Sequence, residues 1–378
     1  MKKVIYINIF IIIIFSISSC STREKLLILN WGEYINDEVV LLFEEEYNCD
    51  VIINIAESNE LFYAKIKSGT TAYDLVVPSE YMVEKMVNNN LLQEINYELL
   101  PNYDPLNNPL MPGVKGIQSA MFEGNEKFAV PYFWGTFGLM YNKKIVGLEE
   151  AIISSGWQAF FEEEKVPKGT RVGMYNIPRF AYAAAMFYHH LSPNIQSNEM
   201  LILAERTLSM RKFSQWGTDT LKKGIASNNL DLAFVYTGDF LDTLYIKLAV
   251  DSNIENITFN IYIPQETIAF MDSLVIPKKA RHVELAHKFI NFFLKPENAY
   301  ENASVVGYCT PLQLAYDHIV SYQGDDLWLR SWAYATKTYY PLPNPSDVVQ
   351  YKGTPIANFN RNYLNEINTI VNNIKVNK

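Results

Sequence analysis

The stretch LLILNWGEYINDEVVLLFEEEY, residues 26–47, predicts a short apolar strand, a loop and a helix. The apolar run at 26–29 ends at Asn30, and the residues from 36 to 47 mix apolar and acidic side chains at helical spacing. A strand followed by a helix then occurs twice more. Strand-like residues 50–55 and 73–77 precede helical stretches at 58–66 and 80–87. Strands that alternate with helices predict an α/β fold with a parallel, doubly wound sheet.

A second α/β region follows an extended segment, residues 132–141, which contains two glycines and no helix cap. We interpret this segment as a crossover between two lobes. The apolar residues 268–277 predict a strand that returns to the first lobe. The other elements predicted in this half are helices at 157–164, 181–190, 283–294 and 359–374 and strands at 171–175 and 230–236.

The composition favours a large globular protein. The chain has 378 residues, of which 49% are hydrophobic and 14% aromatic, which excludes a disordered chain. A net charge of -9 argues against a nucleic-acid partner. The three cysteines, Cys20, Cys49 and Cys309, fit no zinc site, and the five histidines are predicted at the surface. Because no HExxH, GxSxG, P-loop or GxGxxG motif occurs, we expect neither an enzyme nor a cofactor or metal site.

The first 19 residues predict an export signal, with two early lysines, an apolar run at 4–15 and small residues before Cys20. The apolar run is shorter than the roughly 20 residues that a membrane-spanning helix needs. The sequence before Cys20 resembles the lipobox of bacterial lipoproteins, which implies cleavage at 1–19, lipidation of Cys20 and a tether at 20–25. A plain signal peptide is the alternative.

Aromatic, acidic and hydroxyl side chains follow three predicted strands, at the edge where ligands collect in open α/β sheets. Aromatic faces cover methylene groups and attract cations, and carboxylates neutralise them, so this set suits a ligand with ammonium ends. The residues are Trp31, Glu33 and Tyr34, then Ser79 and Tyr81, then Tyr236 and Asp239. The structural alternatives are core aromatics, a helix cap at Ser79 and a turn residue at Asp239.

Asp272 is a lone acid within the apolar stretch FMDSLVIP, residues 270–277. A carboxylate there is costly unless it is paired or hydrogen-bonded, so we single it out as a candidate binding residue. Tyr339 and Tyr340 are an adjacent pair of the kind that holds ferric ion in some periplasmic iron carriers, although the prolines that follow favour a loop.

Six motifs resemble, in order, those of the polyamine-binding proteins of bacterial ABC importers, the spermidine and putrescine receptors. They are NWGEYI (30–35), ESNE (57–60), AYDLVVPS (72–79), YTGD (236–239), MDSLVIP (271–277) and GYCTP (307–311). The likeness runs from Leu26 to Leu314. It implies a two-lobed type II periplasmic binding protein, each lobe a doubly wound mixed sheet with flanking helices, joined by hinge crossovers. The lobes would comprise 26–136 plus 272–318 and 137–271 plus 319–378.

The resemblance also implies a ligand site between the lobes, in which Asp272 pairs with an amine and Asp239 matches an acid of putrescine-type receptors. The site residues would be Trp31, Glu33, Tyr34, Ser79, Tyr81, Tyr236, Asp239, Phe270, Asp272 and Tyr308. Two departures stand out. Residues 176–180 read NIPRF where spermidine receptors carry Asp-Asp-x-Arg-Glu, and Tyr236 and Phe270 replace frequent tryptophans. These changes favour a diamine.

The function implied is that of a monomeric, lipid-anchored receptor in the periplasm or on the outer face of the cytoplasmic membrane. It would capture putrescine or spermidine and deliver it to a permease, touching the membrane through its lipid alone. One alternative is a receptor for another solute: a zwitterion held by Arg179 beside Asn176, another cation, or ferric ion. Another is a surface lipoprotein that engages a host or envelope partner.

Overall fold

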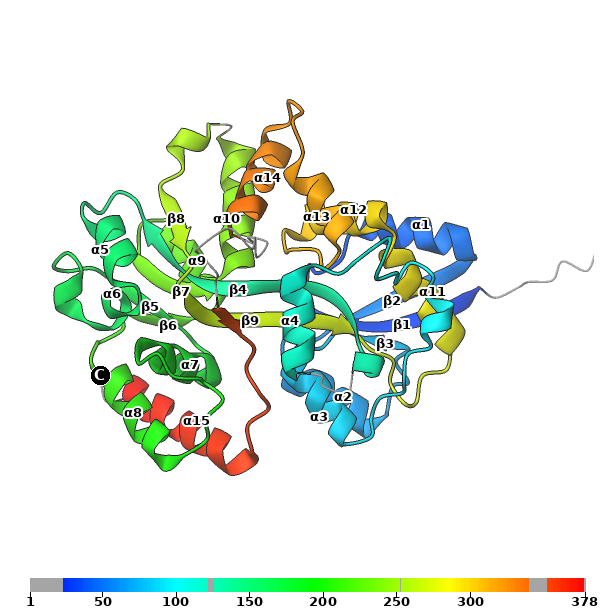
Figure 1. Ribbon diagram of the computed structural model, residues 1–378, viewed down its shortest axis with the longest axis horizontal. Helices are drawn as coiled ribbons and strands as arrows, with labels where there is room; N and C mark the ends of the chain where they lie inside the picture. Colours follow the sequence, from blue (N-terminus) through cyan, green and yellow to red (C-terminus); the bar gives the residue numbers. More distant parts are fainter. Residues whose placement is uncertain (1–22, 122–125, 252, 340–351, 377–378) are drawn as a thin grey trace, which may run out of the picture.

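The computed structural model describes residues 23–121, 126–251, 253–339 and 352–376. Figure 1 shows two α/β halves side by side, with strands β4 (Val130–Asn142) and β9 (Glu266–Leu274) running between them. The two strands pair antiparallel, with a register shift between Pro131 and Phe133. Both predicted crossovers are confirmed, and all 13 residues of β4 are buried. The connection between the halves is therefore a packed two-stranded ribbon.

The first half is built on three parallel strands in the order β2-β1-β3. Their bounds are Glu24–Asn30 for β1, Cys49–Ile55 for β2 and Leu75–Val76 for β3. The strand predicted at 73–77 is thus shortened to two residues. Val275, just beyond β9, bridges Val76 antiparallel, which makes this sheet mixed as predicted.

Among the described residues, seven helices surround this sheet, and local signals set the limits of the first two. They are α1 (Asp37–Tyr47), α2 (Asn59–Ser68), α3 (Glu80–Asn88), α4 (Pro112–Met121), α11 (Val283–Phe293), α12 (Pro296–Val306) and α13 (Gln313–Val320). Asn36 caps α1 by accepting the Glu38 N–H at 2.9 Å, and Ser58 caps α2 by accepting the Leu61 N–H at 3.2 Å. Gly69, with φ of 62°, ends α2, because glycine tolerates the left-handed conformation.

The second half contains the larger sheet, in the order β10-β9-β4-β7-β5-β6, with β8 also pairing β4. The remaining strands are β5 (Val172–Tyr175), β6 (Gln215–Gly217), β7 (Leu232–Tyr236), β8 (Phe259–Tyr262) and β10 (Lys352–Thr354). The helices are α5 (Leu148–Ser155), α6 (Trp157–Phe161), α7 (Pro178–Tyr188), α8 (Asn198–Ser209), α9 (Asp219–Ala226), α10 (Thr237–Val250), α14 (Leu327–Tyr339) and α15 (Arg361–Val376). Helix α7 begins three residues before its predicted start because Pro178 occupies its first turn.

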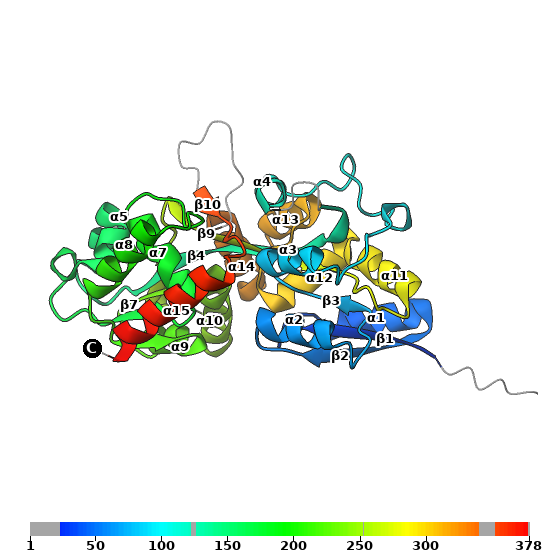
Figure 2. The ribbon, with the colours of Figure 1, turned by 90° about the horizontal axis from the view of Figure 1, so that it is seen from below.

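The C-terminal segment returns to the second half. Strand β10 pairs parallel with β9, with Lys352 opposite Glu266. Figure 2 shows α15 in red beside α7 and α8, where the hydroxyls of Tyr363 and Tyr182 are 2.9 Å apart. Tyr340, the three prolines after it, the export signal and Cys20 lie outside the described residues. The residue boundaries of the two lobes stay a prediction.

One surface prediction is wrong. His287 is buried because α11 packs it against the residues before Tyr97, where its Nε2 accepts the Asn96 N–H at 2.9 Å. Cys49 and Cys309 are buried free thiols. Within the described part of the chain, no helix is long and apolar enough to cross a membrane.

Candidate functional site

Asp272 lies on the hinge strand β9, and two hydroxyl groups of the first half bind its carboxylate. Ser79 Oγ donates to Oδ1 at 2.6 Å, and Tyr34 Oη donates to Oδ2 at 2.7 Å. The side chain is only 6% exposed, and no Lys, Arg or His of the described residues forms a salt bridge with it. Asp272 is therefore a buried carboxylate that is hydrogen-bonded but not neutralised.

Burial raises the pKa of Asp272 to about 6, while the hydrogen bonds from Ser79 and Tyr34 favour the ionised form. Burial, together with the neighbouring Asp272, raises the pKa of the Tyr34 phenol, so that it remains a donor. The carboxylate is ionised at neutral pH and keeps lone pairs free for a further donor.

Ser79 occupies the N-cap position of α3, but its side chain makes no capping hydrogen bond. Instead Asn59 holds it in place, because Asn59 Nδ2 donates to Ser79 Oγ and Asn59 Oδ1 accepts the Ser79 N–H, both at 3.0 Å. The alternative that Ser79 only caps a helix is therefore wrong. Its hydroxyl is directed at Asp272.

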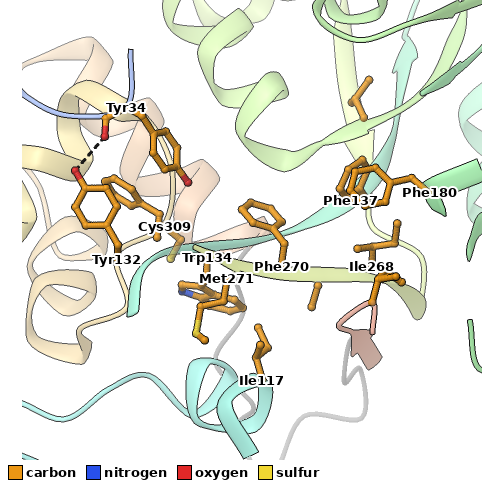
Figure 3. Close-up of a cluster of buried hydrophobic side chains, with 14 of the residues drawn as sticks. Tyr34, Ile117, Tyr132, Trp134, Phe137, Phe180, Ile268, Phe270, Met271 and Cys309 are labelled. Carbon is orange, nitrogen blue, oxygen red and sulfur yellow. Dashed lines mark hydrogen bonds between the residues drawn. The ribbon is translucent and has the colours of Figure 1, made fainter. Parts of the chain in front are cut away.

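A row of aromatic rings continues from Tyr34 into the second half. Tyr34 and Tyr308 have ring centroids 5.3 Å apart, Tyr308 and Phe270 are 5.8 Å apart, and Phe270 and Tyr236 are 4.9 Å apart. Figure 3 shows Phe270 and Met271 on opposite sides of β9, with Tyr34 on the side of Phe270. Because side chains alternate along a strand, Asp272 shares the face of Phe270.

The two halves touch directly at this row. Gly238 lies in the first turn of α10, and a Cβ at this position would overlap the ring of Tyr308. Tyr81 of α3 makes a second contact, because the Arg179 guanidinium stacks on its ring with Cζ 3.8 Å from the centroid. The described conformation is one in which the halves are closed on each other.

Asp239 has a different environment from Asp272. It is 5% exposed, and its Oδ1 is 3.2 Å from Lys222 Nζ, which also binds Asp242 at 2.7 Å. Its Oδ2 is buried without a hydrogen-bond partner. Burial raises the pKa of Asp239 to about 6, against the opposing effect of Lys222. The prediction of a free binding carboxylate missed this internal ion pair.

Trp31 lies next to the Ser79 segment, whereas Glu33 does not join the cluster. The Trp31 indole N–H donates to the Val77 carbonyl at 2.8 Å, and its ring meets Phe62 edge-on at 4.6 Å. Glu33 is exposed in a turn with φ of 53°. Direct contacts thus join six of the ten predicted site residues in one cluster: Tyr34, Ser79, Tyr236, Phe270, Asp272 and Tyr308. Trp31, Tyr81 and Asp239 make their described contacts with other residues, and Glu33 lies at the surface.

Sequence reasoning missed Glu80, which is buried and accepts the Met271 N–H at 3.0 Å. Burial raises its pKa to about 8, so Glu80 is mostly protonated at neutral pH. Its position beside two predicted site residues, Ser79 and Tyr81, was the available signal. Asn176 and Arg179, which the sequence places three positions apart, have different surroundings, because Asn176 is exposed and its side chain binds Lys375, whereas Arg179 is buried.

Two α/β halves joined by a two-stranded hinge, with a buried acid and aromatic rings where they meet, define the class of two-lobed solute-binding proteins. Residues 29–300 match the family described as bacterial extracellular solute-binding protein, and the chain belongs to this family.

Two relatives of known function and one solved structure are similar to this chain. The chain is 29% identical over 297 residues to the putrescine-binding periplasmic protein SpuD of Pseudomonas aeruginosa, covering 76% of this chain and 78% of that protein. It is 27% identical over 298 residues to the putrescine-binding periplasmic protein PotF of Escherichia coli, covering 75% and 76%. The spermidine/putrescine substrate-binding protein PotD of Streptococcus pneumoniae superimposes with a TM-score of 0.73 at 26% identity, over 93% of this chain and 99% of that one.

Proposed function

We propose that this protein is the substrate-binding component of an ABC importer, and that it captures a polyamine between its two lobes for delivery to a permease. The relatives support the class of ligand, since they include putrescine-binding and spermidine/putrescine-binding proteins. The family consists of binding proteins for transport, and binding and release require no chemical step.

The observation that carries the proposal is the environment of Asp272. A buried, ionised carboxylate without a cationic partner is unfavourable, and a ligand ammonium group would neutralise it. Phe270 and Tyr308 lie close by and offer aromatic faces to methylene groups and to the cation. The site therefore has the chemistry to recognise one ammonium end and the adjoining hydrocarbon of a polyamine.

Closure of the lobes supplies the rest of the mechanism. The hinge strand β9 carries Asp272, while Ser79 and Tyr34 come from the first half and Tyr236 from the second. A ligand that contacts both halves favours the closed conformation by its differential affinity for that state. A permease that binds the closed form would then distinguish loaded from empty receptor.

Calorimetry tests the proposal with the purified full chain, titrated with butane-1,4-diamine and with spermidine. We expect one site per chain, and a loss of at least about 100-fold in affinity for Asp272→Ala, because removing one member of a buried charge pair costs roughly 3–5 kcal/mol. Asp317→Asn, an exposed acid on α13, is the matched control. Absence of binding by every polyamine, or unchanged affinity in Asp272→Ala, would contradict the proposal.

Extracytoplasmic attachment through Cys20 is part of the same proposal, and it rests on the lipobox-like residues before that cysteine. Multiple acyl chains hold a protein at a membrane surface, since each buried methylene contributes about 0.8 kcal/mol. Cys20→Ser should move the protein from the membrane fraction to the soluble fraction and abolish incorporation of labelled palmitate. Membrane retention without label would indicate an uncleaved signal instead.

A further inference from the structure

Two buried charges of opposite sign lie on either side of one short segment, Ser79–Tyr81, and neither is neutralised. Asp272 binds the hydroxyl of Ser79, and Arg179 stacks on the ring of Tyr81. The two charges do not form a salt bridge with each other. Glu80, between Ser79 and Tyr81 in the sequence, is influenced by both charges, since burial raises its pKa most, Asp272 raises it further and Arg179 lowers it.

Arg179 is a buried arginine without an acidic partner in the described part of the chain. Its side chain is 4% exposed, and Nη1 is buried without a hydrogen-bond partner. No carboxylate of the described residues pairs with it, although buried arginines are normally paired. Its guanidinium Cζ lies over two aromatic rings, 3.8 Å from the centroid of Tyr81 and 5.7 Å from that of Phe359. Because an unpaired buried charge is unfavourable, an anion bound to this guanidinium would stabilise it.

Arg179 lies at the start of a helix, which adds to the positive charge that an anion would neutralise. It occupies the first turn of the 11-residue helix α7, whose N-cap residue, Ile177, provides no capping side chain. The positive end of the helix dipole therefore adds to the guanidinium charge. The segment NIPRF, residues 176–180, contains no acid that could compensate either of them.

We propose that the same inter-lobe site also accepts a second class of ligand, an ω-amino carboxylate, with its ammonium group at Asp272 and its carboxylate at Arg179. The guanidinium fork matches a carboxylate in a bidentate arrangement, which an ammonium-only ligand cannot use. The methylene chain between the two ends would lie against the aromatic side chains of the site. This inference rests on the proposed function for its use of Asp272 and extends the range of ligands beyond polyamines.

The internal pairing of Asp239 supports the same conclusion. A diamine brings two cationic ends, but Asp239 already has Lys222 as its partner, which leaves Asp272 as the buried acid of the site without a cation. An ω-amino carboxylate brings one cation for Asp272 and one anion for Arg179. Its charges therefore complement both of the groups that the described residues leave unpaired.

The test compares three kinds of ligand by calorimetry: ω-amino acids from 4-aminobutanoate to 6-aminohexanoate, butane-1,4-diamine, and 1-aminobutane. The last has one ammonium group and no second charged group. At least one ω-amino acid should bind about 100-fold more tightly than 1-aminobutane, as expected for a buried charge-assisted pair. Arg179→Gln should abolish that advantage, so that the ω-amino acid and 1-aminobutane bind the variant with similar affinity. Arg206→Gln, which removes an exposed charge on α8, is the matched control.

The outcomes separate this inference from the proposed function. Tight binding of the diamine alone, with no preference for ω-amino acids over 1-aminobutane, overturns the inference and keeps the polyamine function. Tight binding of an ω-amino acid, with no binding of butane-1,4-diamine or of spermidine, overturns the polyamine function. An equal loss for all three ligands in Arg179→Gln, with an unchanged melting temperature, shows that Arg179 acts only on lobe closure and also overturns the inference.

Discussion

Asp272 and Asp239 are two acids with almost the same burial and very different partners. Both are at least 94% buried, and burial raises the pKa of each to about 6. Asp272 receives hydrogen bonds from two neutral hydroxyl groups, whereas Asp239 pairs with the ammonium group of Lys222. Burial alone therefore does not identify a binding carboxylate. What matters is whether the protein itself supplies the counter-charge.

The largest expected effect concerns the stability of the ligand-free protein and the ionisation of Asp272. The pKa of Asp272 rises from an ordinary 3.8 to about 6 on folding, so ionisation destabilises the folded state by on the order of 3 kcal/mol above pH 6. Asp272→Asn should therefore increase the free energy of unfolding at pH 8, and this gain should vanish below pH 4, where the wild-type acid is protonated in both states. Urea denaturation at both pH values measures the difference, and a variant less stable than wild type at pH 8 contradicts it.

The pH dependence of amine binding should follow the same group. Binding of an ammonium ligand requires ionised Asp272, so affinity should fall about tenfold per pH unit below pH 6. Calorimetry of butane-1,4-diamine from pH 8 to pH 4 measures this slope. A flat profile down to pH 4 would show that the carboxylate keeps an ordinary pKa in the ligand-free protein.

Closure of the halves is tested at Gly238. Alanine at this position overlaps the ring of Tyr308 in the described conformation, and overpacking of this kind costs about 1–3 kcal/mol. We expect Gly238→Ala to weaken ligand binding by about 10- to 100-fold through the closed state. Gly116→Ala on α4, where nothing lies within 4 Å of the added Cβ, is the control and should bind normally. Small-angle scattering with ligand reports whether the variant still closes.

Asp239→Asn should have a smaller effect on amine affinity than substitution of Asp272. Lys222 already neutralises much of the Asp239 charge, and it retains Asp242 as a partner in the variant. We expect at most about a tenfold loss, or roughly 1.4 kcal/mol. A loss as large as that of Asp272→Ala would falsify the distinction between the two acids and show that the ligand displaces Lys222.

Glu80→Gln should have the smallest effect. With a pKa of about 8, Glu80 is mostly protonated at pH 7, so an amide of the same shape changes little there. Affinity for the diamine should stay within about threefold of wild type, a change of roughly 0.6 kcal/mol. At pH 9 the ionised wild-type carboxyl adds negative charge near Asp272, and the wild type should bind more tightly than the variant. A tenfold loss at pH 7 would contradict the protonated state.

The order of elements was predictable because local physics determines it. Asn36 and Ser58 are good helix caps, Gly69 tolerates the left-handed conformation, and apolar runs such as 26–29 form buried strands. The strand ends that carry Trp31, Ser79 and Tyr236 follow from the same pattern. The exact limits of the elements do not follow from this pattern. Strand β3 has two residues where five were predicted, because hydrogen bonding with neighbouring strands decides where pairing stops.

Patterns along the chain were enough to predict the α/β class and the two hinge crossovers, and the family resemblance pointed to the side chains near Asp272. Folding then sets which groups interact: the hydroxyls of Ser79 and Tyr34 with Asp272, Lys222 with Asp239, and Tyr81 with Arg179. Propensity and periodicity act over a few neighbouring residues, whereas the cost of a buried charge depends on partners 17 to 238 positions away.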